Sequence, residues 1–354
     1  MKRRTLILGM GLGASMFGAH GSAAPAPAAL PEALGRAATA SRLARNSALL
    51  TATRTDSRLL VAGERGTVLW SDDHGEQWTQ ARVPGQMSIT ALAFGNAREG
   101  WAAGHFGVLL RTQDGGQSWT FAMDGIQAAQ LLQRSATTDA QRQAAQRQVE
   151  QGADKPLFDI ALSEGGLLAV GAYGMALHRR AGDGSFEAIG SKLPNPRQLH
   201  LYAVRARGRH AYIAGEQGLL LRSTDGADRF EPLPSPYKGS FFGLELLGDS
   251  TVLAYGLRGN IWRSTDHGES WKKIPSPLPV NLSSATRLND GGLVLLAQNG
   301  DLLISRDEGL TFAHTPATEP FPAAALVAAA DGNHLVFGGL RGLKRQTLAS
   351  ILTP

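Results

Sequence analysis

The chain has 354 residues, with no cysteine, 43 glycines, and 35 Lys and Arg residues against 30 Asp and Glu residues. The absence of cysteine excludes disulfide scaffolds and thiol chemistry, and the glycine content is typical of a turn-rich β protein. The formal net charge of +5 falls to +2, 32 bases against 30 acids, once the three basic residues at positions 2–4 are removed with the N-terminal segment, so charge gives no support for nucleic-acid binding.

Residues 1–28 have the pattern of a secretory signal peptide. Three basic residues at positions 2–4 precede an apolar run over residues 5–19, and small residues follow, with cleavage points after Ala23 or Ala28. The run is short for a membrane span, and no cysteine is present for acylation. We expect cleavage and a periplasmic or secreted mature chain; a buried first helix and twin-arginine export are alternatives.

One pattern, Ser/Thr-x-Asp-x-Gly-x-x-Trp, returns along most of the chain. Clear copies begin at Ser71, Thr112 and Ser264, and weaker copies begin at Ser223 and Ser305. The starts at 71 and 112, 223 and 264, and 264 and 305 are each 41 residues apart, which indicates a repeat architecture. The acids and tryptophans of the pattern that we assign to structure are Asp73, Trp78, Asp114, Trp119, Asp225, Asp266, Trp271 and Asp307.

These residue types have a local physical reason. An Asp carboxylate accepts backbone N–H groups in a tight turn, a Ser or Thr hydroxyl does the same, and glycine supplies the positive φ. The aromatic residue after the turn begins the next strand and can pack against a neighbouring sheet. We therefore interpret the acids as structural rather than catalytic.

A second signal, an apolar run that ends in a glycine turn, precedes each copy. The seven turns lie at residues 63–66, 104–107, 171–174, 215–218, 256–259, 297–300 and 339–342. Short strands at regular spacing, four to each unit, predict an all-β fold over residues 46–348: a seven-bladed β-propeller of four-stranded blades. A parallel β-helix has shorter coils, and a helical solenoid needs a 3.6-residue period that is missing here.

The seventh unit ends without an acidic turn or an outer strand. We therefore expect residues 29–45, a linker rich in Ala and Pro, to supply the missing strand and close the ring, leaving residues 349–354 as a tail.

One insertion breaks the period. The glycine turns that end at Gly107 and Gly174 are 67 residues apart, which leaves about 26 extra residues within residues 124–155. A modest helical stripe and a capping residue at Thr138 predict a helical hairpin. It is either a solvated excursion or a partner-binding arm.

The repeats resemble the Asp-box, or bacterial neuraminidase, repeat. Paired with the G-x-x-G turns, they are similar to those of the photosystem II stability and assembly factor family and its bacterial relatives, over nearly all of residues 46–345. The resemblance implies a seven-bladed propeller without known catalysis that binds a membrane protein during assembly on the luminal or periplasmic side. Sialidases, sortilin-like receptors and xyloglucan-cleaving hydrolases share the Asp box, and the insertion departs from the family pattern.

Strand order places the glycine turns and the insertion on one face and the acidic turns on the other. We expect a protein partner, a membrane protein or its exported segment, to bind the glycine-turn face, since Arg and aromatic residues anchor protein interfaces. The candidate residues are Arg65, Phe106, Tyr173, Arg258, Arg341, Tyr237, Lys238 and Phe241. The alternative is that each Arg is only a solvated turn residue.

Catalysis has weaker candidates. Glu64 and Glu216, in glycine turns of units one and four, form the best carboxylate pair for a sialidase-like hydrolase. His74, His105 and His267 lack metal-ligand spacing, so we interpret them as solvated turn residues. We expect a monomeric, non-catalytic assembly or accessory factor for an envelope membrane protein complex, with no cofactor, metal or nucleic acid; a carbohydrate- or peptide-binding receptor is a further alternative.

Overall fold

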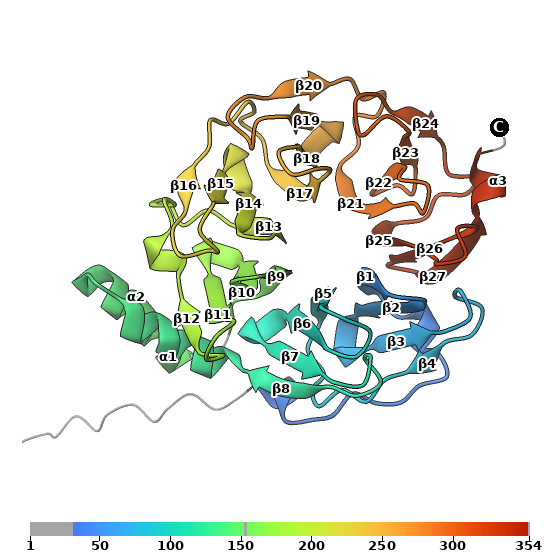
Figure 1. Cartoon of the computed structure of the whole chain (residues 1–354). Helices are drawn as coiled ribbons and strands as arrows, with labels where there is room; N and C mark the ends of the chain where they lie inside the picture. The colour runs from blue at the N-terminus through green and yellow to red at the C-terminus, as the bar shows by residue number, and fades with distance from the viewer. Residues whose placement is uncertain (1–30, 152–153, 353–354) are drawn as a thin grey trace, which may run out of the picture.

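The computed structural model describes residues 31–151 and 154–352 and forms a ring of seven antiparallel sheets (Figure 1). Six sheets have four strands in meander order and the seventh has three, so the predicted seven-bladed propeller is confirmed. The predicted signal peptide, residues 1–28, lies outside the described residues. None of the helices in the described part of the chain is long and apolar enough to cross a membrane.

The blades follow one another along the chain. Blade 1 contains β1 (Leu49–Thr55), β2 (Arg58–Gly63), β3 (Val68–Ser71) and β4 (Thr79–Gln80), and blade 2 contains β5 (Ile89–Phe94), β6 (Gly100–Gly104), β7 (Leu109–Thr112) and β8 (Thr120–Met123). Blade 3 contains β9 (Leu157–Ser163), β10 (Gly166–Gly171), β11 (Ala176–Arg180) and β12 (Phe186–Ala188), and blade 4 contains β13 (Leu201–Arg207), β14 (His210–Gly215), β15 (Leu220–Ser223) and β16 (Glu231–Pro232).

The remaining blades repeat this plan. Blade 5 contains β17 (Phe241–Leu246), β18 (Val252–Gly256), β19 (Ile261–Ser264) and β20 (Lys272–Ile274), and blade 6 contains β21 (Leu282–Arg287), β22 (Leu293–Ala297), β23 (Leu302–Ser305) and β24 (Ala313–Thr315). Blade 7 contains β25 (Ala323–Ala328), β26 (His334–Gly339) and β27 (Gly342–Thr347), followed by the helix α3 (Leu348–Leu352). Ile351 of α3 is buried between blades 6 and 7, so the expected C-terminal tail is in part a packed helix.

The hydrophobic core is divided among the interfaces between blades. Seven clusters of buried side chains each join two neighbouring blades; Leu60 and Ile89, for example, meet between blades 1 and 2. Because a blade is covered on both faces, its second strand is apolar along almost its whole length, as in β6 and β18, where all five residues are buried. Burial of apolar surface between blades therefore supplies the main stabilisation of the ring.

Each acidic turn is held by its own hydrogen bonds. In blade 5, Asp266 Oδ1 accepts the Ser264 hydroxyl (2.7 Å) and the Ser270 N–H (2.9 Å), and Ser264 Oγ accepts the Gly268 N–H (2.8 Å). His267 and Gly268 adopt φ values of 58° and 91°, and Trp271 then packs in the cluster between blades 4 and 5. The turn fixes where that aromatic side chain enters the neighbouring interface.

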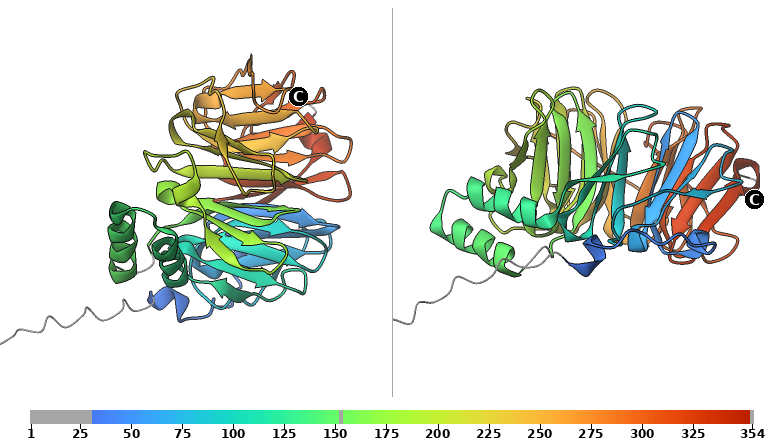
Figure 2. Two further views of the ribbon diagram at one scale, coloured as in Figure 1. Left: turned by 60° about the vertical axis from the view of Figure 1, so that its left-hand side comes forward. Right: turned by 90° about the horizontal axis from the view of Figure 1, so that it is seen from below.

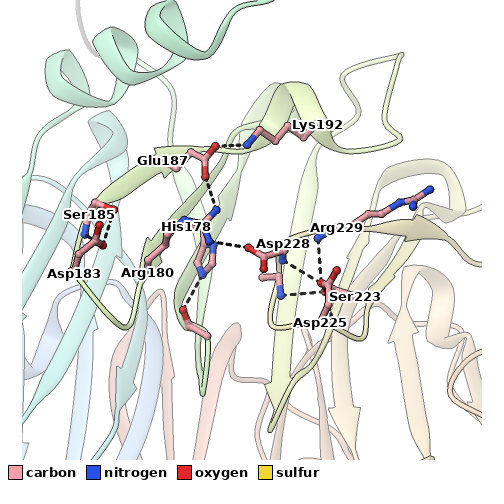
Figure 3. A network of polar contacts seen from close by, with 12 residues as sticks. His178, Arg180, Asp183, Ser185, Glu187, Lys192, Ser223, Asp225, Asp228 and Arg229 are labelled. Atoms are coloured by element: carbon pink, nitrogen blue, oxygen red, sulfur yellow. Dashed lines mark hydrogen bonds and ion pairs between the residues drawn. The ribbon is translucent and has the colours of Figure 1, made fainter.

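An arginine from the preceding blade binds the backbone of this turn. Arg222 Nη1 donates to His267 O (3.0 Å), and Arg263 Nε donates to Glu308 O (2.9 Å) in the next blade. Two further interfaces have the same contact, Arg345 Nε to His74 O (2.9 Å) and Arg58 Nη1 to Gly115 O (3.0 Å), and at a third Arg180 Nη1 binds a side chain of the turn, Asp228 Oδ1 (2.7 Å). Figure 3 shows the last of these, where Arg180 also binds Glu187 within blade 3.

The ring closes without an exchanged strand, which corrects the expectation for residues 29–45. Within residues 31–46 the chain forms only short 3₁₀ turns, η1 (Glu32–Leu34) and η2 (Ala44–Asn46). The segment runs along blade 1 instead, because side-chain amides capture its backbone: Gln80 Nε2 donates to Thr39 O (3.0 Å) and Gln86 Nε2 donates to Ala37 O (3.0 Å). No outer strand is therefore added to blade 7.

Packing and one arginine join the first and last blades. Leu49 and Val61 of blade 1 share a buried cluster with Val327 and Val336 of blade 7. Arg345 adds its bond to His74 O and an ion pair with Glu76 (3.3 Å). The seam is therefore an ordinary interface between blades.

The predicted helical hairpin is confirmed and joins blade 2 to blade 3. It consists of α1 (Gly125–Ser135) and α2 (Asp139–Gln151), each capped by the residue at its start: Asp124 Oδ1 accepts the Gln127 N–H (2.9 Å), and Thr138 Oγ1 accepts the Gln141 N–H (3.2 Å). Ala128 of α1 is fully buried in the cluster between blades 2 and 3. Figure 2 shows the hairpin projecting from the side of the ring.

We predict that Arg222→Ala lowers the free energy of unfolding by about 1.5–3 kcal/mol, because it removes charge-assisted bonds and leaves His267 O without its donor. Arg111→Ala is the matched control, at the equivalent position of blade 2, where the arginine pairs with Glu99 (2.9 Å) and lies over Trp101, both of its own blade. It should cost less than about 1 kcal/mol. Urea denaturation measures both; equal losses would contradict the role given to the contact between blades.

We predict that the acidic turns make the protein less stable as the pH falls from 4 toward 2. The bonds from Ser270 and Ser264 lower the pKa of Asp266 to about 2, and those from Thr311 and Ser305 do the same for Asp307. A lowered pKa in the folded state gives stability that is present above the unfolded pKa and lost as the pH falls through the folded one.

Asp266→Asn tests this pH dependence, because its amide keeps one acceptor but no charge. The variant should be less stable than the wild type at pH 7, and the difference should shrink toward pH 2 in thermal unfolding. Asp249→Asn, at a fully exposed carboxylate, is the control and should follow the wild type. A constant difference at every pH would contradict the prediction.

Candidate functional site

The glycine turns form one rim of the ring, here called the glycine-turn rim. In five of them the third residue has a left-handed backbone although it is not glycine, with φ between 52° and 62°: Arg65, Phe106, Tyr173, Gln217 and Arg258. The left-handed conformation costs about 1–2 kcal/mol for each such residue, and it persists only where surrounding contacts hold it. Two of these residues are held by hydrogen bonds to a side chain that precedes the next blade: Tyr173 N–H donates to His200 Nδ1 (3.0 Å), and Arg258 N–H donates to Asn281 Oδ1 (2.9 Å).

Glycine is needed at the flanking positions because other backbone lies very close. A Cβ on Gly63 would lie 1.9 Å from Ala48 O, and one on Gly66, whose φ is 70°, would lie 2.1 Å from Gly85 O. The two glycines thus allow the turn to pack closely against this backbone, and Arg65 between them is exposed.

The structure separates the predicted interface residues into two groups. Arg65, Tyr173, Arg258, Arg341 and Lys238 are exposed, and within residues 31–151 and 154–352 no ion pair joins any of these four cations to a carboxylate. Their free charge is available to a partner.

The other three are more enclosed. Phe241 is fully buried between blades 4 and 5, so its assignment to a partner-binding surface was wrong; the first residue of an inner strand faces the neighbouring blade. Tyr237 is half-buried against Phe241 (ring centroids 5.8 Å apart), and Phe106 is half-buried against the cluster between blades 1 and 2.

The two glutamates proposed as a catalytic pair have structural partners. Glu64 Oε1 accepts the Ala48 N–H (3.1 Å), and Glu216 Oε2 accepts the His200 N–H (3.2 Å). Neither residue lines the central channel. The pair therefore does not face a common cleft there.

The three turn histidines differ in environment. His105 is exposed on the glycine-turn rim, whereas His74 is partly buried and His267 stacks on His210 with ring centroids 4.9 Å apart. Burial and the nearby His267 lower the pKa of His210. In the described part of the chain, no group of three or more His, Cys, Asp or Glu residues is arranged to hold a metal ion.

The central channel encloses about 690 Å³ and is lined by the inner strand of every blade. Each inner strand carries a register shift at its first residues, and the unpaired residue of each bulge lines the channel. In chain order these residues are Leu50, Thr90, Phe158, Tyr202, Phe242, Ser283 and Ala324. Three neighbouring blades, 3 to 5, thus contribute an aromatic side chain at the same height.

These aromatic side chains continue outward to the rim. Tyr202 lies 5.7 Å from Phe158 and 5.4 Å from Phe242 between ring centroids, and His200 lies 6.0 Å from Tyr202 and 4.8 Å from Tyr173. All five are at least partly exposed. We call this set, Tyr173, His200, Phe158, Tyr202 and Phe242, the aromatic crescent.

Below the crescent, the channel wall contains a charged cluster. Arg205 Nη1 binds Asp159 Oδ2 (2.6 Å), and its Nε lies 3.9 Å from Glu245 Oε1. Burial raises the pKa of the Glu245 carboxyl, with Arg205 and Arg287 opposing the shift, and burial beside Glu245 raises the pKa of Tyr255. Burial disfavours the charge of Arg205, but Asp159 and Glu245 more than offset this, so its pKa is raised.

A groove lies between the helical hairpin and blade 3, here called the hairpin groove. It encloses about 430 Å³. Leu132 and Ala145 from the two helices form one wall, and Tyr173, Met175 and Pro194 lie on the propeller side. Tyr173 belongs to both the groove and the aromatic crescent.

Apart from Tyr173, sequence reasoning missed the crescent, and it missed the charged cluster, because the repeat pattern does not mark these positions. The available signal was the residue one place into each inner strand, which is aromatic only at Phe158, Tyr202 and Phe242. Asp159, Arg205 and Glu245 likewise interrupt otherwise apolar strands.

Comparisons with known proteins support the fold alone. No protein-family profile and no curated protein sequence matches the chain. Among solved structures, "YCF48 bound to D1 peptide" is 17% identical (TM-score 0.61; 85% of this chain and 93% of that chain covered). YCF48 from Cyanidioschyzon merolae is 15% identical (0.55; 76% and 88%), and a streptogramin B lyase is 14% identical (0.65; 86% and 94%).

We predict that Glu216→Gln keeps the free energy of unfolding within about 0.5 kcal/mol of the wild type, because an amide oxygen still accepts the His200 N–H. Glu216→Ala removes that acceptor and should cost about 1 kcal/mol. Thermal or urea denaturation compares the two variants. A loss in the Gln variant equal to that in the Ala variant would show that the carboxylate charge, not the hydrogen bond, is what matters.

Proposed function

We propose that the protein is an exported, non-catalytic propeller that binds a protein partner on its glycine-turn rim. The observation that carries the proposal is the set of exposed cations without carboxylate partners on that rim. Arg65 and Arg258 are held outward by left-handed backbone, and Arg341 stands in the corresponding turn of blade 7. Arginine in such a setting can form bidentate bonds with a partner's carboxylates.

The partner is proposed to be a membrane protein or its exported segment, and the chain an assembly or accessory factor for an envelope complex. The signal-peptide pattern at residues 1–28 and the resemblance of the repeats to the assembly-factor family support this. One similar propeller, YCF48, has been solved with a peptide bound. We propose that the mature chain acts as a monomer in the periplasm or outside the cell.

Catalysis is the second candidate, since a streptogramin B lyase shares the fold. The described site gives it less support, because Glu64 and Glu216 accept backbone N–H groups and do not line the channel. In the channel, Asp159 already binds Arg205 (2.6 Å) and accepts the Val204 N–H (2.9 Å), so it is not a free partner for Glu245 in the pair of carboxyl groups that glycoside cleavage needs.

We predict that affinity capture from solubilised envelope with the wild-type protein recovers a membrane protein. The variant Arg65→Glu/Arg341→Glu should recover at least about tenfold less of that membrane protein, because two interface cations become anions. Quantitative mass spectrometry of the captured proteins is the measurement.

The matched control is Arg98→Glu/Arg229→Glu, which changes net charge equally at two exposed arginines away from the glycine-turn rim. It should leave recovery unchanged. Equal recovery with the rim variant and the wild type would count against the rim as the binding surface. Turnover of fluorogenic glycosides by the wild type, lost in Glu216→Gln, would favour the enzyme instead.

A further inference from the structure

The hairpin groove and the aromatic crescent form one continuous track. Tyr173 lines the groove, its ring contacts His200, and the ring of His200 leads to Phe158 and Tyr202 at the channel mouth. Tyr173 has more than half of its surface exposed, at 57%, and Phe242 ends the track on blade 5. The rings thus extend from the insertion to the channel across blades 3 to 5.

The track is built at a cost in backbone strain. Two of the residues that line the groove, Tyr173 and Gln198, are left-handed with φ values of 55° and 52°. The conformation of Tyr173 recurs in the glycine turns of four other blades, whereas that of Gln198 is not part of the repeat, and such strain persists only where the surrounding structure holds it. Here the side chain of His200 holds the backbone of Tyr173.

Two cations lie along the track: Lys155, which is ion-paired, and Arg197, for which the described residues supply no carboxylate. Lys155 is the charged side chain among the described residues that line the groove, and its Nζ lies 5.2 Å from the Tyr173 ring centroid. Its nearest carboxylate is the adjacent Asp154 (2.7 Å). Arg197 is exposed beside the groove and donates only to the neutral Gln217 (2.7 Å). An occupant with carboxylates would complement these cations.

The rings favour an aromatic side chain over a sugar. Tyr173 meets His200 at an interplanar angle of 64° and Tyr202 meets Phe242 at 72°, while Tyr202 is tilted by 35° to Phe158, so the rings do not form one flat platform. Edge-to-face packing suits another aromatic ring. Glu216, the nearby carboxylate that could bind sugar hydroxyls, already accepts the His200 N–H.

We propose that this track binds an extended, acidic segment of the protein partner, with the segment's backbone in the hairpin groove and one aromatic side chain packed in the crescent. The proposal rests on the proposed protein-binding function and assigns the insertion a role as one wall of the binding site. An acidic segment would keep its carboxylates near Lys155 and Arg197 while its aromatic anchor is desolvated at the channel mouth.

A random 12-residue peptide library displayed on phage, selected against the full-length mature protein, tests the proposal. Enriched peptides should contain an aromatic residue flanked by Asp or Glu. Their affinities are then measured by fluorescence anisotropy with synthetic copies. Substitutions are taken from equivalent positions of other blades so that they suit the fold: Phe158→Ser/Tyr202→Ser follows Ser283, and Tyr173→Gln follows Gln217.

The expected results differ between variants. Phe158→Ser/Tyr202→Ser should weaken binding at least tenfold, Lys155→Glu/Arg197→Glu should weaken it several-fold with a reduced dependence on salt, and Leu50→Ser, at the bulge of blade 1, should change nothing. Thermal unfolding confirms that each variant is folded. Enrichment of basic or purely aliphatic peptides, or equal affinity in the crescent variant and the wild type, would overturn the proposal.

A glycan array, probed in parallel with the same protein, tests the main alternative occupant of the track, which is a carbohydrate. Glycan binding that depends on Tyr202, with no peptide enriched, would overturn the assignment to a peptide. The proposed function is tested separately. Unchanged envelope capture by Arg65→Glu/Arg341→Glu would count against binding at the rim arginines. If capture is lost in that variant but kept in Phe158→Ser/Tyr202→Ser, the proposed function stands and the role of the aromatic crescent is disproved.

Discussion

An arginine that reaches from one blade into the acidic turn of the next links five of the seven neighbouring pairs of blades in this ring. The Asp carboxylate and the Ser or Thr hydroxyl hold two consecutive left-handed residues, and the carbonyl between them, as at His267, is turned toward the preceding blade. The contact is found where the following blade has an acidic turn, and blades 3 and 7, which lack one, receive no such arginine from the described residues. The carboxylates of these turns are thereby held in hydrogen bonds, and the surfaces proposed for recognition are the glycine-turn rim and the channel.

The fold followed from the sequence because its signals are local and repeated. The 41-residue spacing from Ser264 to Ser305, the glycine turns and the interval between Gly107 and Gly174 were enough to predict seven blades and a helical hairpin. The closing strand was predicted wrongly, because the side chains that capture residues 37–39, those of Gln80 and Gln86, belong to another part of the chain. Phe241 was misplaced for a similar reason, since a one-residue difference from Phe242 decides between core and channel.

The proposed recognition surface combines a repeated part and a unique part. Every blade supplies a bulged residue to the channel mouth, but only the side chains of blades 3 to 5 are aromatic there, and the hairpin stands beside blade 3. A ring of nearly equivalent positions can therefore become asymmetric through three side chains and one insertion, without any change in the backbone that carries them.

The seam between blades 1 and 7 has a consequence for how the molecule forms. Six of the buried clusters join blades that are adjacent in the chain, but the seventh joins Leu49 and Val61 to Val327 and Val336, so it cannot assemble until nearly all of the polypeptide has emerged. Because no strand is shared between blades 1 and 7, the apolar face of blade 1 stays exposed to solvent until blade 7 has been made. A chaperone that binds this apolar face would protect the incomplete chain. Without a chaperone, two incomplete chains would aggregate through it.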